Sequence, residues 1–265
     1  MSPLVAIDQV DVPHLAFSPP SRILQMKDLA LEPTVLSLVA TTNPFPLLSH
    51  EAVLAHRRAL FSPEVRGMAP RYAPFICQFW HSPEVLKTIS DIAGVELVPA
   101  LDFETSHTNV QLGPDGVDGV RARPIEPPIA TLEAIRKSDG STLKVRAPQM
   151  GSAMLLQRRY ITHTAAPVTN MPERVTIVTS FRPKDPMLLD ETTRANIRNK
   201  SHLSELYYQW MTYRLDVLAG CARIAADAVR KRYEENTVNV AEIQEWAGDQ
   251  MAYIQQTLHE MRLLV

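Results

Sequence analysis

The chain is poor in the residues that mark secreted and membrane-spanning proteins. It has two cysteines among 265 residues, nine glycines, and an aromatic content of 6%. Cys77 and Cys221 are too few for a disulfide framework and lack metal-ligand spacing, which favours a reducing compartment. No run of about 18 residues is free of charged and polar breaks, so we expect no membrane span. Residues 1–22 lack a basic segment followed by an apolar core, so we expect no signal peptide and a cytoplasmic protein.

The chain also has no marked excess of acidic over basic residues, or of basic over acidic ones. The 27 basic and 29 acidic residues give a net charge of −2. A balanced surface gives no electrostatic reason to bind nucleic acid or an anionic membrane, so we expect neither as a partner. The hydrophobic content of 45% is ordinary for a globular protein.

Proline, with 21 residues, is more abundant than glycine and falls mostly before Pro186. Proline removes a backbone donor, so we expect only short helices in this part. Ser49 is suited to cap a helix that ends near Leu60. Ser82 and Pro83 predict a helix start, and Gly94 predicts its end. Period-two patterns then predict six strands, at residues 95–101, 108–112, 142–147, 153–157, 160–163 and 174–182.

The C-terminal part changes to a helical pattern. Apolar residues from Leu203 onward predict a helix to about Glu234, and a second helix is predicted from Val240 to Leu264, with Ile243, Ala247, Ile254 and Leu258 on its packing face. Two consecutive long helices predict an antiparallel hairpin. The order predicts an α+β protein whose β-barrel or jelly-roll core is braced by helices. We expect one domain, with an N-terminal helical or extended region (1–94), a β core (95–183) and a C-terminal helical hairpin (200–265).

One pair of motifs carries chemistry. His163 ends a predicted strand, and eleven residues later Arg174 begins the next, with Thr176 two places on. A histidine can bind ferrous iron, and an arginine with a nearby hydroxyl can bind the distal carboxylate of 2-oxoglutarate. The same pattern also fits a hydrogen-bonded histidine at a strand end and a salt-bridged arginine.

The sequence resembles a group of fungal Fe(II)/2-oxoglutarate-dependent dioxygenases of secondary metabolism, including members that oxidise valine-like amino acids. The resemblance covers most of the chain from about residue 60. It is carried by residues 107–113, 145–151, 155–157, 159–163, 173–183 and 203–210, and the block from Tyr160 to Pro183 is its specific part. It implies a double-stranded β-helix (jelly-roll) core, with His163 as an iron ligand and with Arg174 and Thr176 as the 2-oxoglutarate site. It also implies Fe(II) and 2-oxoglutarate as cofactors and a small-molecule substrate.

The departure from this family is large. None of the eight histidines is followed two places later by Asp or Glu, so the H-x-D or H-x-E pair of the iron site is missing. By the resemblance this pair belongs between residues 120 and 141, an interval that contains no histidine. Six predicted strands are also fewer than the eight of the implied fold, so we expect an incomplete core.

Three explanations stay open. The chain can reflect a gene-model error, it can be a genuine pseudoenzyme, or a different ligand set can form from Asp102, Glu104 and His107 together with His163. Asp102 and Glu104 would alternate onto one strand face. The leading hypothesis is a dioxygenase-like protein that oxidises an amino acid or another small metabolite, and that is inactive if the triad is incomplete. The alternative is a non-catalytic binding or interaction protein on the same scaffold, with the helical hairpin as a homodimer surface.

Overall fold

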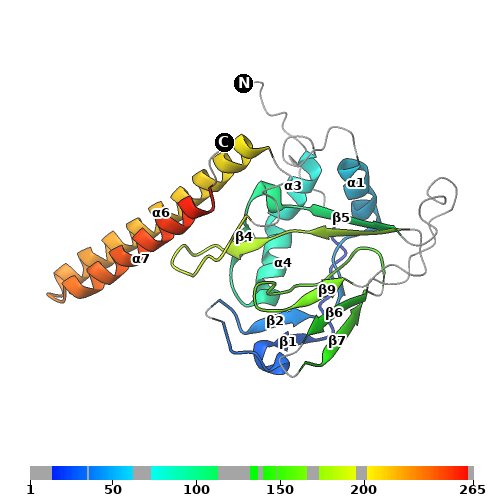
Figure 1. Cartoon of the computed structure of the whole chain (residues 1–265), viewed down its shortest axis with the longest axis horizontal. Helices are drawn as coiled ribbons and strands as arrows, with labels where there is room; N and C mark the ends of the chain where they lie inside the picture. Colours follow the sequence, from blue (N-terminus) through cyan, green and yellow to red (C-terminus); the bar gives the residue numbers. More distant parts are fainter. Residues whose placement is uncertain are drawn as a thin grey trace. The chain divides into compact units, whose positions relative to one another are not determined.

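The computed structural model describes residues 14–34, 36–61, 73–112, 132–136, 140–147, 149–165, 173–194 and 202–261. The chain divides into two compact units, Met1–Phe181 and Arg182–Val265. The fold is mixed α+β, with short strands in small sheets and two helices at the C-terminal end (Figure 1). This confirms the predicted class. Among the described residues, no helix combines the length and the hydropathy that a membrane span needs.

Three helices form the apolar centre of the first unit. They are α1 (His50–Leu60), α3 (Pro74–His81) and α4 (Pro83–Ala93). Ser49 accepts a hydrogen bond from the backbone of Ala52, and Ser82 accepts one from Val85, so both predicted caps are confirmed. Gly94 ends α4 at φ +70°, a left-handed conformation in which glycine meets no steric penalty. The cluster that these helices share includes Phe45, Leu47, Ile76, Phe79, Val85 and Ile89.

Eleven short strands fall within the described residues. They are β1 (Ile23–Gln25), β2 (Val39–Thr42), β3 (Phe45–Pro46), β4 (Leu97–Pro99), β5 (His107–Leu112), β6 (Leu132–Arg136), β7 (Thr142–Arg146), β8 (Ser152–Ala153), β9 (His163–Ala165), β10 (Glu173–Val178) and β11 (Phe181–Pro183). The four strands β1, β2, β3 and β6 were not predicted. The first three lie inside the N-terminal region predicted as helical or extended (1–94), and β6 lies inside the interval from 120 to 141, where no strand was predicted before residue 142.

The strand pairs are nested along the chain. β4 pairs with β11, β5 pairs antiparallel with β10, and β6 pairs antiparallel with β9, while β7 adds to the other side of β6. Each later strand therefore returns to pair with a progressively earlier one. β3 pairs with β8 and β1 with β2, both antiparallel. A second apolar cluster, of Met26, Leu29, Ala40, Val145 and Ile161, includes residues of β2 and β7.

Three strand predictions were wrong in detail. The spacing of His163 and Arg174 predicts that their strands, 160–163 and 174–182, are antiparallel neighbours, but β9 pairs with β6 and β10 pairs with β5. The predicted strand at residues 160–163 begins only at His163, after a turn. Asp102 and Glu104 lie in the 3-10 helix η3 (Asp102–Glu104) and not on a strand face. The H-x-D segment was expected between residues 120 and 141. Most of this interval lies outside the described residues, namely residues 120–131 and 137–139.

The second unit is built on α6 (Leu203–Glu234) and α7 (Val240–His259). The bounds of α6 confirm the prediction, and residues 262–264 of the predicted second helix lie outside the described ones. The two helices pack together, since the Trp210 indole donates to the backbone oxygen of Thr257 at 3.1 Å. The predicted packing face of α7 was wrong. Ile243, Ile254 and Leu258 are 37–55% exposed, and α7 meets α6 through Tyr253 and Thr257.

Candidate functional site

The paired strands β5 and β10 bring the 2-oxoglutarate candidates together on one face. Arg174 lies directly opposite Gln111, and Thr176 lies opposite Asn109. Residues directly opposite each other in an antiparallel pair share a face, and alternate residues of one strand do too. Arg174, Thr176, Asn109 and Gln111 therefore form one polar face of this ribbon. His107, opposite Val178, lies on the same face at its other end.

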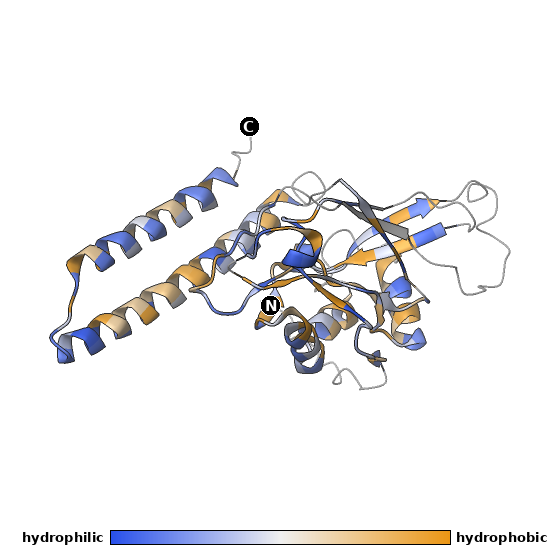
Figure 2. Ribbon diagram, turned by 90° about the horizontal axis from the view of Figure 1, so that it is seen from below, coloured by the Kyte–Doolittle hydropathy of each residue, from blue (hydrophilic) through white to orange (hydrophobic). Residues whose placement is uncertain are grey.

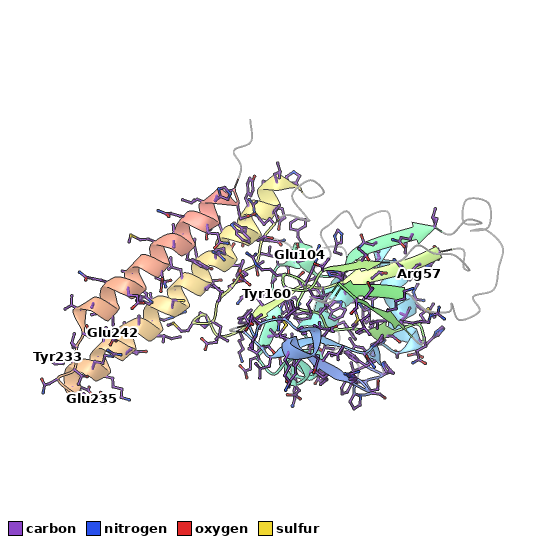
Figure 3. The ribbon with its side chains drawn as sticks, turned by 60° about the horizontal axis from the view of Figure 1, so that its bottom comes forward. Arg57, Glu104, Tyr160, Tyr233, Glu235 and Glu242 are labelled. Carbon is purple, nitrogen blue, oxygen red and sulfur yellow. The ribbon has the colours of Figure 1, made fainter. Side chains whose placement is uncertain are left out.

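The reverse face of the ribbon points toward α1. Glu173, whose side chain alternates with that of Arg174, forms an ion pair with Arg57 of α1 at 2.5 Å. Figure 1 shows α1 above β5 and the sheet of β7, β6 and β9 below it, and Figure 3 labels Arg57 beside the strand ends. The polar face is the opposite face of the ribbon, and on it Arg174 is buried, Gln111 and Thr176 are half-buried and Asn109 is exposed.

Burial makes this polar face chemically unusual. Arg174 is only 7% exposed. The Gln111 side-chain oxygen is also buried, and it has no hydrogen-bond partner in the described part of the chain. A buried guanidinium is stabilised by the anionic and polar groups around it, and in this low-polarity surrounding its hydrogen bonds to a carboxylate are strong. The carboxamide can present either its oxygen or its NH₂ group by a flip. A buried cation beside a buried amide and a hydroxyl is a suitable set for a carboxylate.

His163 lies apart from this ribbon in the strand order. It is half-buried in β9, opposite Ile135 of β6, and its Nδ1 is 2.9 Å from the backbone oxygen of Ile161. If Nδ1 carries the proton and donates to this carbonyl, Nε2 keeps its lone pair. The same hydrogen bond also serves a purely structural histidine. The iron-ligand prediction for His163 stays untested.

The residues of the alternative ligand set do not gather around His163. Glu104 is buried, and its carboxylate accepts a hydrogen bond from the Ser180 hydroxyl at 2.8 Å. His107 lies at the start of β5. Asp102 instead lies close to Cys77 and His81 of α3. Among the described residues, these three form the group whose donor atoms are close enough together to bind one metal ion.

The group of Cys77, His81 and Asp102 was missed in the sequence. The signal was present, because a Cys and a His four residues apart lie on one face of a helix. No helix was predicted at residues 74–81, yet Pro74 occupies the first turn of α3, where its missing N–H costs nothing. Burial, and then the nearby Asp102 carboxylate, raise the pKa of the Cys77 thiol to about 11. The metal-free thiol is therefore protonated at neutral pH and is a poor nucleophile.

Comparison of the chain with protein-family models, with curated proteins and with solved structures found no match. The dioxygenase resemblance therefore remains a prediction from the residues quoted for it.

Proposed function

We propose that this chain is a protein similar to the Fe(II)/2-oxoglutarate-dependent dioxygenases that keeps the carboxylate-binding end of their site without a complete iron triad. The observation that carries the proposal is the buried position of Arg174, with Thr176 on the same strand face and Gln111 opposite. The ligand class is a small dicarboxylate or 2-oxo acid, whose distal carboxylate would pair with the guanidinium and accept a hydrogen bond from the hydroxyl.

The strand pairing supports a jelly-roll core. A jelly roll forms when a long antiparallel hairpin is wound between two sheets, so that its pairs are nested and successive strands change sheet. β4·β11, β5·β10 and β6·β9 are nested in this way, and both steps, from β5 to β6 and from β9 to β10, change sheet. A ligand held at Arg174 would then lie on an inner face of the roll.

The iron site does not fit the residues described. No H-x-D or H-x-E exists in the sequence, and the described metal-ligating types do not assemble a triad that includes His163. One imidazole alone does not supply the facial set that ferrous iron requires. We therefore assign no oxidation step to His163, and we expect the chain not to release succinate from 2-oxoglutarate at the rate of a competent dioxygenase.

Calorimetric titration with 2-oxoglutarate and with succinate, both without metal, tests the proposal. We expect binding to the wild type, and a loss of at least about tenfold in affinity for Arg174→Lys, which keeps the charge but loses the planar fork. Thr176→Val should weaken binding less. Arg158→Lys, at an exposed arginine, is the matched control. Equal affinity of the wild type and the Arg174→Lys variant would reject the site, and iron-dependent succinate release that His163→Ala abolishes would restore the catalytic hypothesis.

A specific feature of α6 favours the second candidate function, an interaction protein. Its buried stripe includes Leu206, Trp210 and Val217. The opposite side carries a second apolar stripe at heptad spacing, formed by Tyr208, Thr212, Leu215, Ala219, Ala222, Ala226, Val229 and Tyr233. Tyr208, Leu215 and Tyr233 are 66%, 53% and 75% exposed, and the hydropathy colours of Figure 2 show apolar residues along this helix. A seam sustained over about four heptads is typical of a coiled coil.

The occupant that suits this stripe is a second copy of α6 in the antiparallel direction. Tyrosines stand at both ends of the stripe and alanines at its middle, so a two-fold axis near Ala219 and Ala222 pairs like with like. The flanking residues Asp216 and Arg223 are seven positions apart, and this arrangement places each opposite the other on the second copy. A parallel arrangement gives no such charge pair.

Sedimentation analysis with a charge swap tests this dimer. We expect Asp216→Arg and Arg223→Asp each to weaken dimerisation, and the double variant to restore it. Met251→Arg, at an exposed residue of α7, is the control. A wild-type chain that stays monomeric at all concentrations would reject the second copy. Slow hydrogen exchange of the stripe in that monomer would indicate that another part of the chain covers it.

A further inference from the structure

Three potential metal ligands of the first unit converge from two elements that are distant in the sequence. Cys77 and His81 are one helical turn apart on α3, and Asp102 begins η3 twenty-one residues later. One donor atom from each of these side chains lies within 4.8 Å of the other two. A tetrahedral metal with bonds of about 2.0 to 2.3 Å holds its ligand atoms about 3.3 to 3.8 Å apart. The spacing of the three donor atoms therefore exceeds that of a tetrahedral site by at most about 1.5 Å.

The backbone already orients the histidine. The His81 Nδ1 lies 2.8 Å from the backbone oxygen of Cys77 and 3.5 Å from the Cys77 sulfur. With the proton on Nδ1, the ring donates to this carbonyl and Nε2 keeps its lone pair. A ligand histidine commonly donates its second ring nitrogen to a carbonyl in this way, because the bond fixes both the tautomer and the ring orientation.

The donor chemistry selects among the metals. A thiolate, an imidazole and a carboxylate together suit Zn²⁺, which binds sulfur, nitrogen and oxygen at tetrahedral sites. Mg²⁺ and Ca²⁺ prefer oxygen ligands, and the thiolate distinguishes this group from the histidine and carboxylate set of the dioxygenase iron site. His81 is exposed and Cys77 is half-buried, so solvent can reach the group from the histidine side.

We propose that Cys77, His81 and Asp102 form a zinc-binding site with three protein ligands and a fourth position for water. The three ligands lie on α3 and η3, whereas His163 and Arg174 lie on β9 and β10. The zinc proposal therefore does not depend on the proposed carboxylate site. It would link the end of α3 to the segment that leads into β5.

Titration of the whole chain with Co²⁺ tests the site, because Co²⁺ replaces Zn²⁺ and a cobalt–thiolate bond gives a strong near-ultraviolet charge-transfer band. We expect this band at one Co²⁺ per chain, and its removal by one equivalent of Zn²⁺. Cys77→Ser should lose the band, and Cys77→His should bind Co²⁺ without it. His81→Ala and Asp102→Asn should each weaken Zn²⁺ binding at least about tenfold in a competition assay with a chromogenic chelator.

Matched controls separate this site from its alternatives. Cys221→Ser and His163→Ala should bind both metals like the wild type, since Cys221 instead lies 3.0 Å from the backbone oxygen of Pro186 in the second unit. His81 is exposed, so His81→Ala should fold normally, which circular dichroism can verify. The absence of a thiolate band in the wild type would overturn the proposal, and so would a band that persists in the Cys77→Ser variant.

Discussion

The two compact units bury their helices by different means. In the first unit, α3 places Ile76 and Phe79 in a cluster of apolar side chains. In the second unit, the fully buried Trp210 has the guanidinium groups of Arg194 and Arg214 at 5.4 and 5.2 Å from its ring centroid. The free energy of apolar burial is roughly proportional to the area removed from water, whereas a buried cation is stable only while polar and anionic partners compensate its charge.

The polar cluster of the second unit joins α6, α7 and the segment before them. The Arg214 guanidinium donates to the Thr257 hydroxyl and to the Tyr253 backbone oxygen, and lies over the Tyr253 ring. Asp190, 3.8 Å from Arg214, also accepts a hydrogen bond from the Tyr213 hydroxyl. Burial lowers the pKa of Arg214, but the nearby Tyr253 and Asp190 oppose that shift. Thr257 is the one buried residue of α7, so this cluster replaces an apolar interface between the helices.

Trp210→Ala should break the second unit and leave the first intact. The substitution removes a fully buried ring, its bond to Thr257 and two cation–π contacts, and should cost roughly 3–5 kcal/mol. Hydrogen exchange resolved by segment should show lost protection in α6 and α7 with α3 and α4 unchanged. Met251→Ala, at a residue of α7 that is 61% exposed, is the control. An unchanged denaturation midpoint for Trp210→Ala would contradict this account.

Arg214→Met should destabilise the second unit by about 3 kcal/mol, because it leaves the buried Asp190 carboxylate without its cation. The double variant Arg214→Met, Asp190→Asn should recover part of this loss, since it no longer buries an uncompensated charge. Urea denaturation of the two single variants and the double variant measures the coupling. Fully additive losses would show that the two side chains do not interact.

The features predicted well from the sequence were those encoded locally. Ser82, Pro83 and Gly94 set both ends of α4 by their own backbone and side-chain chemistry, and the apolar period from Leu203 was sufficient for α6. The packing face of α7 was missed because Trp210 and Arg214 of α6 bind polar groups of Thr257 and Tyr253 there. Its partners are therefore Thr257 and Tyr253 instead of the more apolar Ile254 and Leu258.

The candidate sites show the same limit. The alternation of Arg174 and Thr176 along one strand was predictable, but their pairing with Gln111 and Asn109 depends on a contact more than 60 positions away in the sequence. Asp102 was assigned to a strand because apolar residues precede it, and the 3-10 turn that brings it to Cys77 and His81 has no local sequence signal that we identified. Nested strand pairing likewise follows from the whole chain and not from any segment.

Lowering the pH should affect the first unit before the second. His56 is buried against Phe75 and Phe79, and its Nε2 has no hydrogen-bond partner in the described part of the chain. Burial holds the pKa of His56 below its ordinary value of 6.5, although the Ala52 carbonyl opposes this shift. Below pH 6.5 the His56 side chain binds a proton more readily in the unfolded chain than in the folded one. The free energy of unfolding is therefore unaffected by this group above pH 6.5. It falls as the pH decreases further, by at most about 1.4 kcal/mol per pH unit.

Denaturation of the first unit between pH 7.5 and 5 checks this expectation. His56→Gln should be less stable at neutral pH but should show a shallower slope, and His50→Gln, at an exposed residue, should keep the wild-type slope. A wild-type slope that survives His56→Gln would assign the pH dependence to another group.

Substitutions at the N-caps of α4 and α6 should give the smallest changes in the free energy of unfolding, a loss in the first unit and a gain in the second. Ser82 caps α4 through the Val85 backbone, so Ser82→Ala should cost the first unit about 1 kcal/mol. His202, at the same position of α6, makes no side-chain capping bond and stands three residues before Glu205. His202→Ser would complete a capping box with Glu205 and should stabilise the second unit by about 0.5 to 1 kcal/mol. Urea denaturation followed separately for each unit would measure both changes. If His202→Ser shifted the first unit instead, the two units would unfold together, and the contrast between their cores would not determine their stability independently.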